Sequence, residues 1–176
     1  MRTPTGTART QLVVLRGNSG SGKSTLATAL RERPMSVVQQ DHVRRIMLHE
    51  DGSEATPETG VLLDRVVRFC LDRGKDVVLE GILDAARYRP VITALLDDHV
   101  GLNHVYYLDV RFEETVLRHG TRPERFAFSA EQMREWYRPH DVLGVDDELV
   151  VGADSSFAQT LARIADALDA GAARTT

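Results

Sequence analysis

The segment from Gly17 to Ser24 constrains the fold of this chain more than any other feature. It fits the pattern G-x-x-x-x-G-K-[ST], follows an apolar run at residues 11–16 and opens a helical stretch at residues 23–33. A strand, a glycine-rich turn and a helix in this order bring backbone N–H groups together around phosphate oxygens. Glycine permits the close approach, and the amino end of the helix adds a favourable dipole. The segment therefore predicts a nucleotide-phosphate site.

The residues of this loop have separate predicted roles. We expect Lys23 to reach the β- and γ-phosphates and the Ser24 hydroxyl to ligate Mg²⁺. Lys23 is one of only two lysines in the chain, so a chance match at this position is rare. The predicted nucleotide-binding residues of the loop are Asn18, Ser19, Gly20, Ser21, Gly22, Lys23, Ser24 and Thr25.

Length and composition limit the remaining classes. The chain has 176 residues, 42% of them hydrophobic, which predicts one globular domain over residues 11–170 with loose tails at residues 1–10 and 171–176. No apolar run approaches the ~18 residues of a membrane span, and the first residues predict no secretory signal. A single cysteine, Cys70, favours a cytoplasmic protein. The net charge of −4 makes long nucleic acid an unfavourable partner, and the oligomeric state stays open.

Short apolar runs alternate with amphipathic stretches along the chain. Strands are expected at residues 11–16, 36–40, 76–79, 104–108 and 148–151, with helices between them. The strands are continuous apolar runs, which is typical of a parallel sheet with both faces covered. The sequence therefore predicts an α/β three-layer sandwich.

Helical spacing also predicts which faces are buried. The inward faces are expected to hold Val43, Ile46 and Met47 after the second strand, Leu62, Val66 and Phe69 in the next helix, and Phe157, Leu161, Ile164 and Leu168 in the last.

Two carboxylates follow the ends of predicted strands. Asp41 ends the second strand and Glu80 the third, and ligands of parallel sheets bind at that edge. Aspartate is also a favoured helix cap, so Asp41 is either a site residue or a cap. Glu80 either belongs to the site, or caps Gly81 or pairs with an arginine.

Together these features resemble the small ATP-dependent kinases of the P-loop superfamily, which include chloramphenicol phosphotransferase-like, zeta-toxin-like and uridine-kinase-like enzymes. Residues 77–83, VVLEGIL, are similar to a V-I-L-E-G-I-L strand in uridine kinases, phosphoribulokinase and pantothenate kinase. The resemblance implies a five-stranded parallel sheet in the order 2-3-1-4-5, with helices on both faces. It also implies that Asp41 accepts the proton of an acceptor hydroxyl and that Glu80 lies beside Mg²⁺ and the substrate.

Residues 118–144 correspond to the small lid of such kinases. The resemblance implies that Arg118 and Arg122 bind ATP phosphates, with Arg122 also catalytic. The alternative for each arginine is a solvated helix end. Trp136 lies either in a wall of the acceptor pocket or in a short helix packed on the sheet edge. The resemblance further places adenine near residues 152–155. The substrate-binding candidates are Asp41, Arg45, Glu80, Tyr137 and His140.

The function most consistent with these residues is transfer of the γ-phosphoryl group of ATP to a hydroxyl of a small molecule, with Mg²⁺ as cofactor. Antibiotic, nucleoside and sugar-like acceptors all fit. The alternatives are an ATP-binding regulatory module with slow hydrolysis and a nucleic-acid end kinase. The chain lacks the Asn-Lys-x-Asp segment of guanine-specific GTPases. His42 and His49 have no third ligand nearby in sequence, so a zinc site is not expected.

Overall fold

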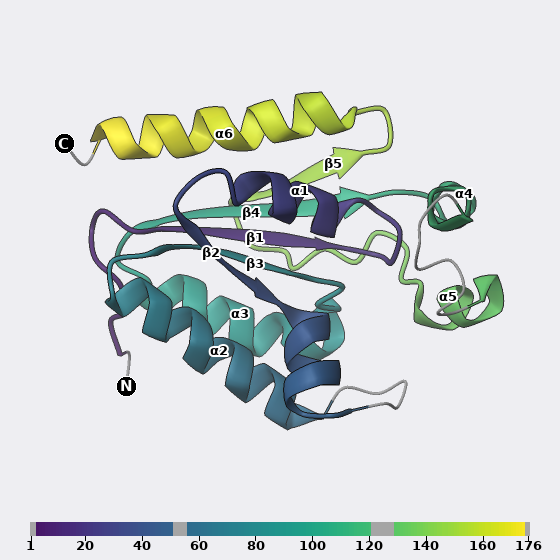
Figure 1. The fold of residues 1–176 in the computed structure, drawn as a ribbon, viewed down its shortest axis with the longest axis horizontal. Coiled ribbons are helices and arrows are strands. Elements are labelled where there is room, and N and C mark those ends of the chain that lie inside the picture. Colours follow the sequence, from purple (N-terminus) through teal and green to yellow (C-terminus); the bar gives the residue numbers. More distant parts are fainter. Residues whose placement is uncertain (1–2, 51–55, 121–128, 175–176) are drawn as a thin grey trace.

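The computed structural model describes residues 3–50, 56–120 and 129–174. Its centre is a parallel sheet in the order β2-β3-β1-β4-β5 (Figure 1). The predicted strand order is therefore confirmed. The strands are β1 (Gln11–Gly17), β2 (Met35–Gln39), β3 (Asp76–Gly81), β4 (Leu102–Asp109) and β5 (Glu148–Gly152).

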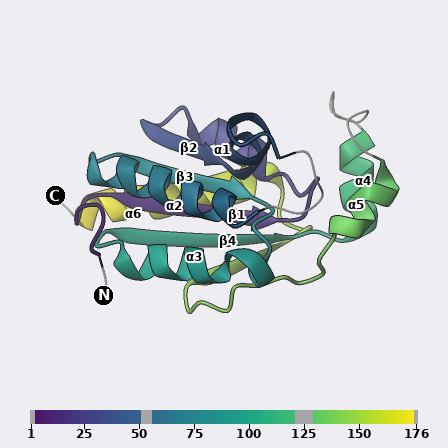
Figure 2. The same cartoon turned by 90° about the horizontal axis from the view of Figure 1, so that it is seen from below.

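Helices cover both faces of this sheet. The helices are α1 (Lys23–Leu30), α2 (Pro57–Asp72), α3 (Ala85–Asp98), α4 (Phe112–Gly120), α5 (Ala130–Trp136), α6 (Phe157–Arg174) and a short π-helix, η1 (His42–Met47). The first and last, α1 and α6, lie on one face, and α2 and α3 lie on the other, whereas α4 and α5 sit beyond the carboxyl ends of the strands (Figure 2). No helix in the described part of the chain has the length and apolar character that a membrane span requires.

The central strand explains why its sequence is a continuous apolar run. Leu12 and Val14 pack into the core shared with α2 and α3, while Val13 and Leu15 pack into the core shared with α1 and α6. All four side chains are fully buried. Since successive residues of a strand point to opposite faces, both faces of the sheet must be apolar here.

Four of the predicted inward positions are wrong. Ile46, Met47 and Phe69 are 70%, 53% and 61% exposed. In α2 the fully buried stripe is Leu63, Val67 and Leu71, and Leu62 and Val66 pack beside it. The helix is therefore rotated by about one residue from the predicted orientation, because α3 and the sheet contact it together. Phe157, also expected inward, is 49% exposed.

The described parts of the two predicted loose tails, residues 3–10 and 171–174, are more ordered than expected. Thr5 and Thr10 are buried, and Thr5 pairs with His99 through a backbone bridge. The Thr5 hydroxyl and the Gly6 N–H both donate to a carboxylate oxygen of Asp72 at 2.7 Å. At the other end, α6 continues to Arg174. Polar residues that appear loose in sequence thus find partners on the folded body.

Candidate active site

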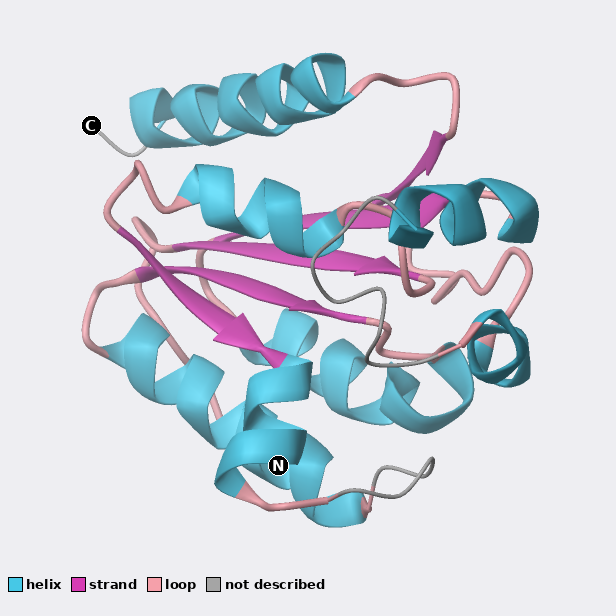
Figure 3. Cartoon of the chain, turned by 45° about the vertical axis from the view of Figure 1, so that its right-hand side comes forward, coloured by secondary structure: helices cyan, strands magenta, loops and turns pink. Residues whose placement is uncertain are grey.

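The glycine-rich loop joins β1 to the amino end of α1 at the carboxyl edge of the sheet (Figure 3). Gly17, Gly20 and Gly22 all have positive φ, at 145°, 80° and 107°. A Cβ at Gly20 would lie 2.6 Å from the Thr115 carbonyl oxygen, whereas one at Gly22 would meet nothing within 4 Å. The loop is therefore tightly packed at Gly20 and open at Gly22, directly before α1, where a phosphate can approach the backbone N–H groups.

The Lys23 side chain lies over the interior of this loop. Its Nζ donates to the Asn18 carbonyl at 2.9 Å and contacts the Ser21 hydroxyl at 3.4 Å. The residue is only 6% exposed. This ammonium is therefore held beside the opening of the loop by acceptors that the loop itself supplies.

The side chains of Ser24 and Glu80 place two oxygen atoms close together next to the loop. The Ser24 Oγ is 3.4 Å from Glu80 Oε2, and Gln39 Nε2 donates to Glu80 Oε1 at 3.0 Å. Within the described residues no group of three or more His, Cys, Asp or Glu side chains could hold a metal ion. One carboxylate plus one hydroxyl fits Mg²⁺, which takes few protein ligands and binds mainly through substrate phosphates and water.

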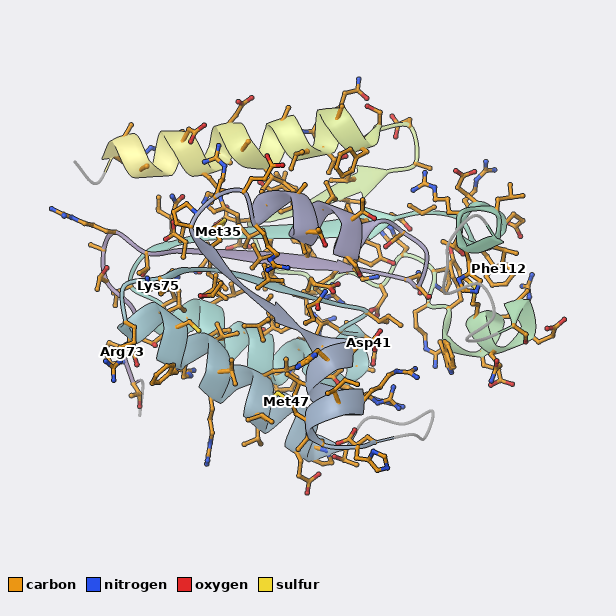
Figure 4. All side chains as sticks on the ribbon, viewed as in Figure 1. Met35, Asp41, Met47, Arg73, Lys75 and Phe112 are labelled. Atoms are coloured by element: carbon orange, nitrogen blue, oxygen red, sulfur yellow. The ribbon has the colours of Figure 1, made fainter. Side chains whose placement is uncertain are left out.

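Asp41 comes two residues after the end of β2 and occupies the N-cap position of η1. Figure 4 shows it at the carboxyl edge of the sheet, at the opposite end from Lys75. Its carboxylate makes no hydrogen bond that caps the helix, so the alternative that Asp41 is only a cap is not supported. The side chain is 70% exposed and lies 3.8 Å from the Arg45 guanidinium.

The wide turn of η1 sets the surroundings of Asp41. The Leu48 N–H donates to the Val43 carbonyl, five residues back, which is the π-helical pattern and is frequent at functional sites. Asp41, Arg44 and Arg45 all line one cavity. A short unusual helix therefore presents one acidic and two basic side chains to the same space.

Three adjoining cavities run along this edge of the sheet. An outer cavity of about 440 Å³ lies between the loop and the residues after β5, and a central cavity of about 870 Å³ contains Lys23, Ser24, Asp41 and Glu80. Gly22, Thr25 and Phe157 line both. Phe157, which the sequence pattern assigned to the core, is a wall of the site.

The third space, which we call the arginine cavity, has a volume of about 220 Å³. It shares Ser19, Asp41, Arg45 and Ile82 with the central cavity. Its full lining is Ser19, Gln40, Asp41, Arg44, Arg45, Ile82, Asp84, Ala86, Arg87, Trp136 and Arg138. Trp136 ends the short helix α5 and lines this cavity, and its role in an acceptor pocket stays a prediction.

The structure does not bring Tyr137 and His140 to these cavities, which differs from the prediction. The Tyr137 hydroxyl donates to the Val110 carbonyl at 3.1 Å, and its ring packs edge-on against Phe112. His140 Nδ1 lies 2.9 Å from a carboxylate oxygen of Asp109. Their positions after α5 direct them toward β4 and α4 rather than toward Asp41.

Of the two predicted lid arginines, Arg118 and Arg122, the structure describes only Arg118. Arg118 lines the outer cavity, with its guanidinium 2.9 Å from Glu114 and 3.3 Å from the Ser21 carbonyl. Arg122 lies outside the described residues.

Sequence reasoning missed a buried ionic cluster that joins the loop to the segment after α5. Arg16 is fully buried and donates to Glu148 at 2.8 Å, to Asp141 at 3.0 Å and to the Leu83 carbonyl. The available signal was a charge at the end of an otherwise apolar buried strand, which must find partners.

A second clamp lies beside this cluster. The Asn18 amide exchanges two hydrogen bonds with the Arg138 backbone, at 2.7 and 2.8 Å. Burial raises the pKa of the Tyr107 phenol to about 12, so it stays protonated and donates to the same Arg138 carbonyl at 3.3 Å. The Asp141 N–H donates to the Tyr107 oxygen at 3.0 Å. These contacts fasten one wall of the arginine cavity to the loop.

A parallel sheet in this order, with a glycine-rich loop between its central strand and the following helix, defines a P-loop protein. A family model described as an AAA domain matches residues 12–140, and the chain belongs to that family. No match is found among curated proteins.

Solved structures share the fold at low identity. The APS kinase CysC of Mycobacterium tuberculosis, in complex with AMPPNP and APS, has a TM-score of 0.70 and a sequence identity of 21%. The match covers 94% of this chain and 99% of the CysC chain. A sugar kinase from Janibacter sp. has a TM-score of 0.69 and a sequence identity of 22%, and the match covers 93% of this chain and 97% of the sugar kinase. A gluconokinase from Sinorhizobium meliloti has a TM-score of 0.57 and a sequence identity of 17%, and the match covers 99% of this chain and 95% of the gluconokinase.

Proposed function

We propose that this protein is an ATP-dependent kinase that transfers the γ-phosphoryl group of ATP to a hydroxyl of a small molecule. The observation that carries the proposal is the position of Asp41, which lines both the central cavity with Lys23 and the arginine cavity beside it. A carboxylate at the junction of a phosphate site and a second pocket fits a residue that orients an acceptor hydroxyl.

In this proposal, the loop and the cavities beside it bind different parts of the substrates. The backbone N–H groups from Ser19 to Ser24 and the Lys23 ammonium bind the β- and γ-phosphates, and the outer cavity holds the nucleoside. Ser24 and Glu80 hold Mg²⁺, which neutralises charge on the phosphates when bound. Arg118, at the edge of the outer cavity, contributes a cation to the nucleotide side, the role that we also propose for Arg122.

Asp41 orients the acceptor hydroxyl toward the γ-phosphorus. A bond forms between the acceptor oxygen and phosphorus, the bond from phosphorus to the β–γ bridging oxygen breaks, and ADP leaves. The hydroxyl proton passes to the Asp41 carboxylate. Positioning contributes more than deprotonation, since phosphoryl transfer proceeds through a loose transition state.

The structural neighbours support this class of reaction. The three similar structures are named as kinases, and one of them holds AMPPNP together with APS. An ATP-binding regulatory module remains the competing function, and it would not require an acidic residue at the junction with a second pocket.

Asp41→Asn tests the proposal, because the amide keeps the volume of the carboxylate but cannot accept the proton. A mass-spectrometric screen of hydroxylated metabolites and antibiotics with Mg·ATP first identifies an acceptor. With it, kcat should fall by ~10²–10⁴-fold, while calorimetric ATP affinity and Tm stay unchanged. Asp166→Asn on the exposed side of α6 is the control. Unchanged kcat in Asp41→Asn would rule out the catalytic role of Asp41, whereas ATP hydrolysis with no acceptor phosphorylated would favour the regulatory module.

A further inference from the structure

The arginine cavity has an excess of positive charge. Its lining contains four arginines and two aspartates. The arginines come from three separate places in the chain, with Arg44 and Arg45 on η1, Arg87 in the first turn of α3, and Arg138 after α5. Cations are rarely gathered in a small cavity without an anion to bind, since their mutual repulsion is unfavourable.

Acidic side chains lie close to three of these arginines. Arg44 pairs with Glu50 at 3.6 Å. Arg45 and Arg87 lie 3.8 and 4.0 Å from the carboxylates of Asp41 and Asp84, which is longer than a hydrogen bond. Asp84 instead accepts the Arg87 N–H at 3.1 Å as the cap of α3. In the described part of the chain, neither the Arg45 nor the Arg87 guanidinium is therefore held by a close carboxylate contact, and both side chains line the cavity.

The other lining residues give this cavity its shape. Arg138 is held at the end of α5, where its Nη1 donates to the carbonyls of Glu135 and Tyr137 at 2.8 and 3.1 Å. Trp136 supplies an aromatic wall. A compact volume, a flat apolar wall and forked guanidinium donors together match a small molecule with an anionic group, because guanidinium pairs with carboxylate or phosphate through two parallel hydrogen bonds.

We infer that the phosphoryl acceptor is a hydroxyl compound that carries its own anionic group, a carboxylate or a phosphate, and that Arg87 binds this group. The inference rests on the proposed kinase function and names the class of its substrate. Arg45 lines the central cavity as well, so it can also contact the γ-phosphate. Arg87 lines only the arginine cavity among the three described here, so it distinguishes acceptor binding from ATP binding.

Fluorescence of Trp136 tests this inference without requiring turnover, since it is the only tryptophan of the chain and lines the cavity. The protein is saturated with AMPPNP and Mg²⁺, which occupies the nucleotide side. It is then titrated at constant ionic strength with glucose, gluconate and glucose 6-phosphate. At least one anionic compound should bind roughly tenfold or more tightly than glucose, and the two anions separate a carboxylate from a phosphate preference.

Arg87→Gln should remove this preference while AMPPNP affinity stays unchanged, and Arg87→Lys should restore part of it. Arg65→Gln, which removes an exposed arginine of α2, should behave as wild type. Equal binding of the neutral and anionic compounds, no response to either anion, or an unchanged preference in Arg87→Gln would overturn the inference. Anion binding that persists where no acceptor is ever phosphorylated would instead contradict the kinase function alone.

Discussion

The two halves of the site are built in opposite ways. The phosphate side is one continuous segment, from Gly17 to Thr25, whose backbone forms the cradle. The arginine cavity takes its side chains from the loop, η1, the start of α3 and the end of α5. A backbone cradle needs particular φ angles and therefore particular glycines, which leaves a sequence pattern. A side-chain cavity needs only that distant residues meet.

The halves are joined by the buried cluster around Arg16. This residue lies on the strand that leads into the loop, while its partners Asp141 and Glu148 belong to the segment after α5. The same segment carries Arg138, which the Asn18 amide clamps. Three parts of the site should therefore respond separately to mutation. They are the Arg16 cluster that links the halves, the glycine-rich loop, and the individual side chains around it.

The largest effect is expected from breaking the link. Arg16→Met leaves Asp141 and Glu148 without their buried cation, so the free energy of unfolding should fall by ~3–5 kcal/mol. Urea denaturation measures the loss. Arg33→Met, which removes the exposed pair with Asp169, is the matched control and should cost about 1 kcal/mol or less. Equal losses in the two variants would show that the Arg16 cluster does not join the halves.

The next effect is on the cradle itself. Lys23→Ala should lower kcat by ~10²–10³-fold and weaken ATP binding, because the ammonium serves the phosphates. Its circular-dichroism spectrum should match wild type. The control is Lys75→Ala, since Lys75 is the only other lysine and lies at the opposite end of the sheet (Figure 4). Near-normal turnover of a folded Lys23→Ala protein would contradict the role of the loop.

A smaller effect is expected at the proposed metal ligands, Ser24 and Glu80, beside the cradle. Glu80→Gln keeps an oxygen next to Ser24 but removes the charge, so the apparent affinity for Mg²⁺ should fall by ~10–100-fold. A titration of turnover with Mg²⁺ at fixed ATP measures it. If the Mg²⁺ dependence and kcat both stay as in wild type, Glu80 serves only to hold Gln39.

The smallest effect is expected from a side chain on the nucleotide half. Arg118→Ala should raise the KM for ATP only a few-fold, about 1 kcal/mol, because backbone groups form most of that half. Steady-state kinetics with varied ATP provides the measurement. A fall in kcat of a hundredfold or more would mean that Arg118 contacts charge that develops in the transition state, and the nucleotide half would then depend on side chains as well.

Whereas the strand order followed from the resemblance to P-loop kinases, the sequence alone determined the alternation of strands and helices, the loop and its helix, and the placement of Asp41 and Glu80 at the edge of the sheet. Each of these depends on contiguous residues, since glycine torsions, apolar runs and strand ends are local properties. The orientation of α2 was predicted wrongly by one residue, because packing against α3 and the sheet, and not helical spacing, selected its buried stripe.

Only the tertiary structure decided the arginine cavity and the Arg16 cluster. Arg87 and Trp136 are 49 residues apart in the chain, and nothing in their local sequence marks them as neighbours. Tyr137 and His140 lie beside Trp136 in sequence yet point toward β4 and α4. Once a helix has ended, the direction of the following side chains depends on what the chain packs against, so long-range contacts determine which of several adjacent polar residues reaches the site.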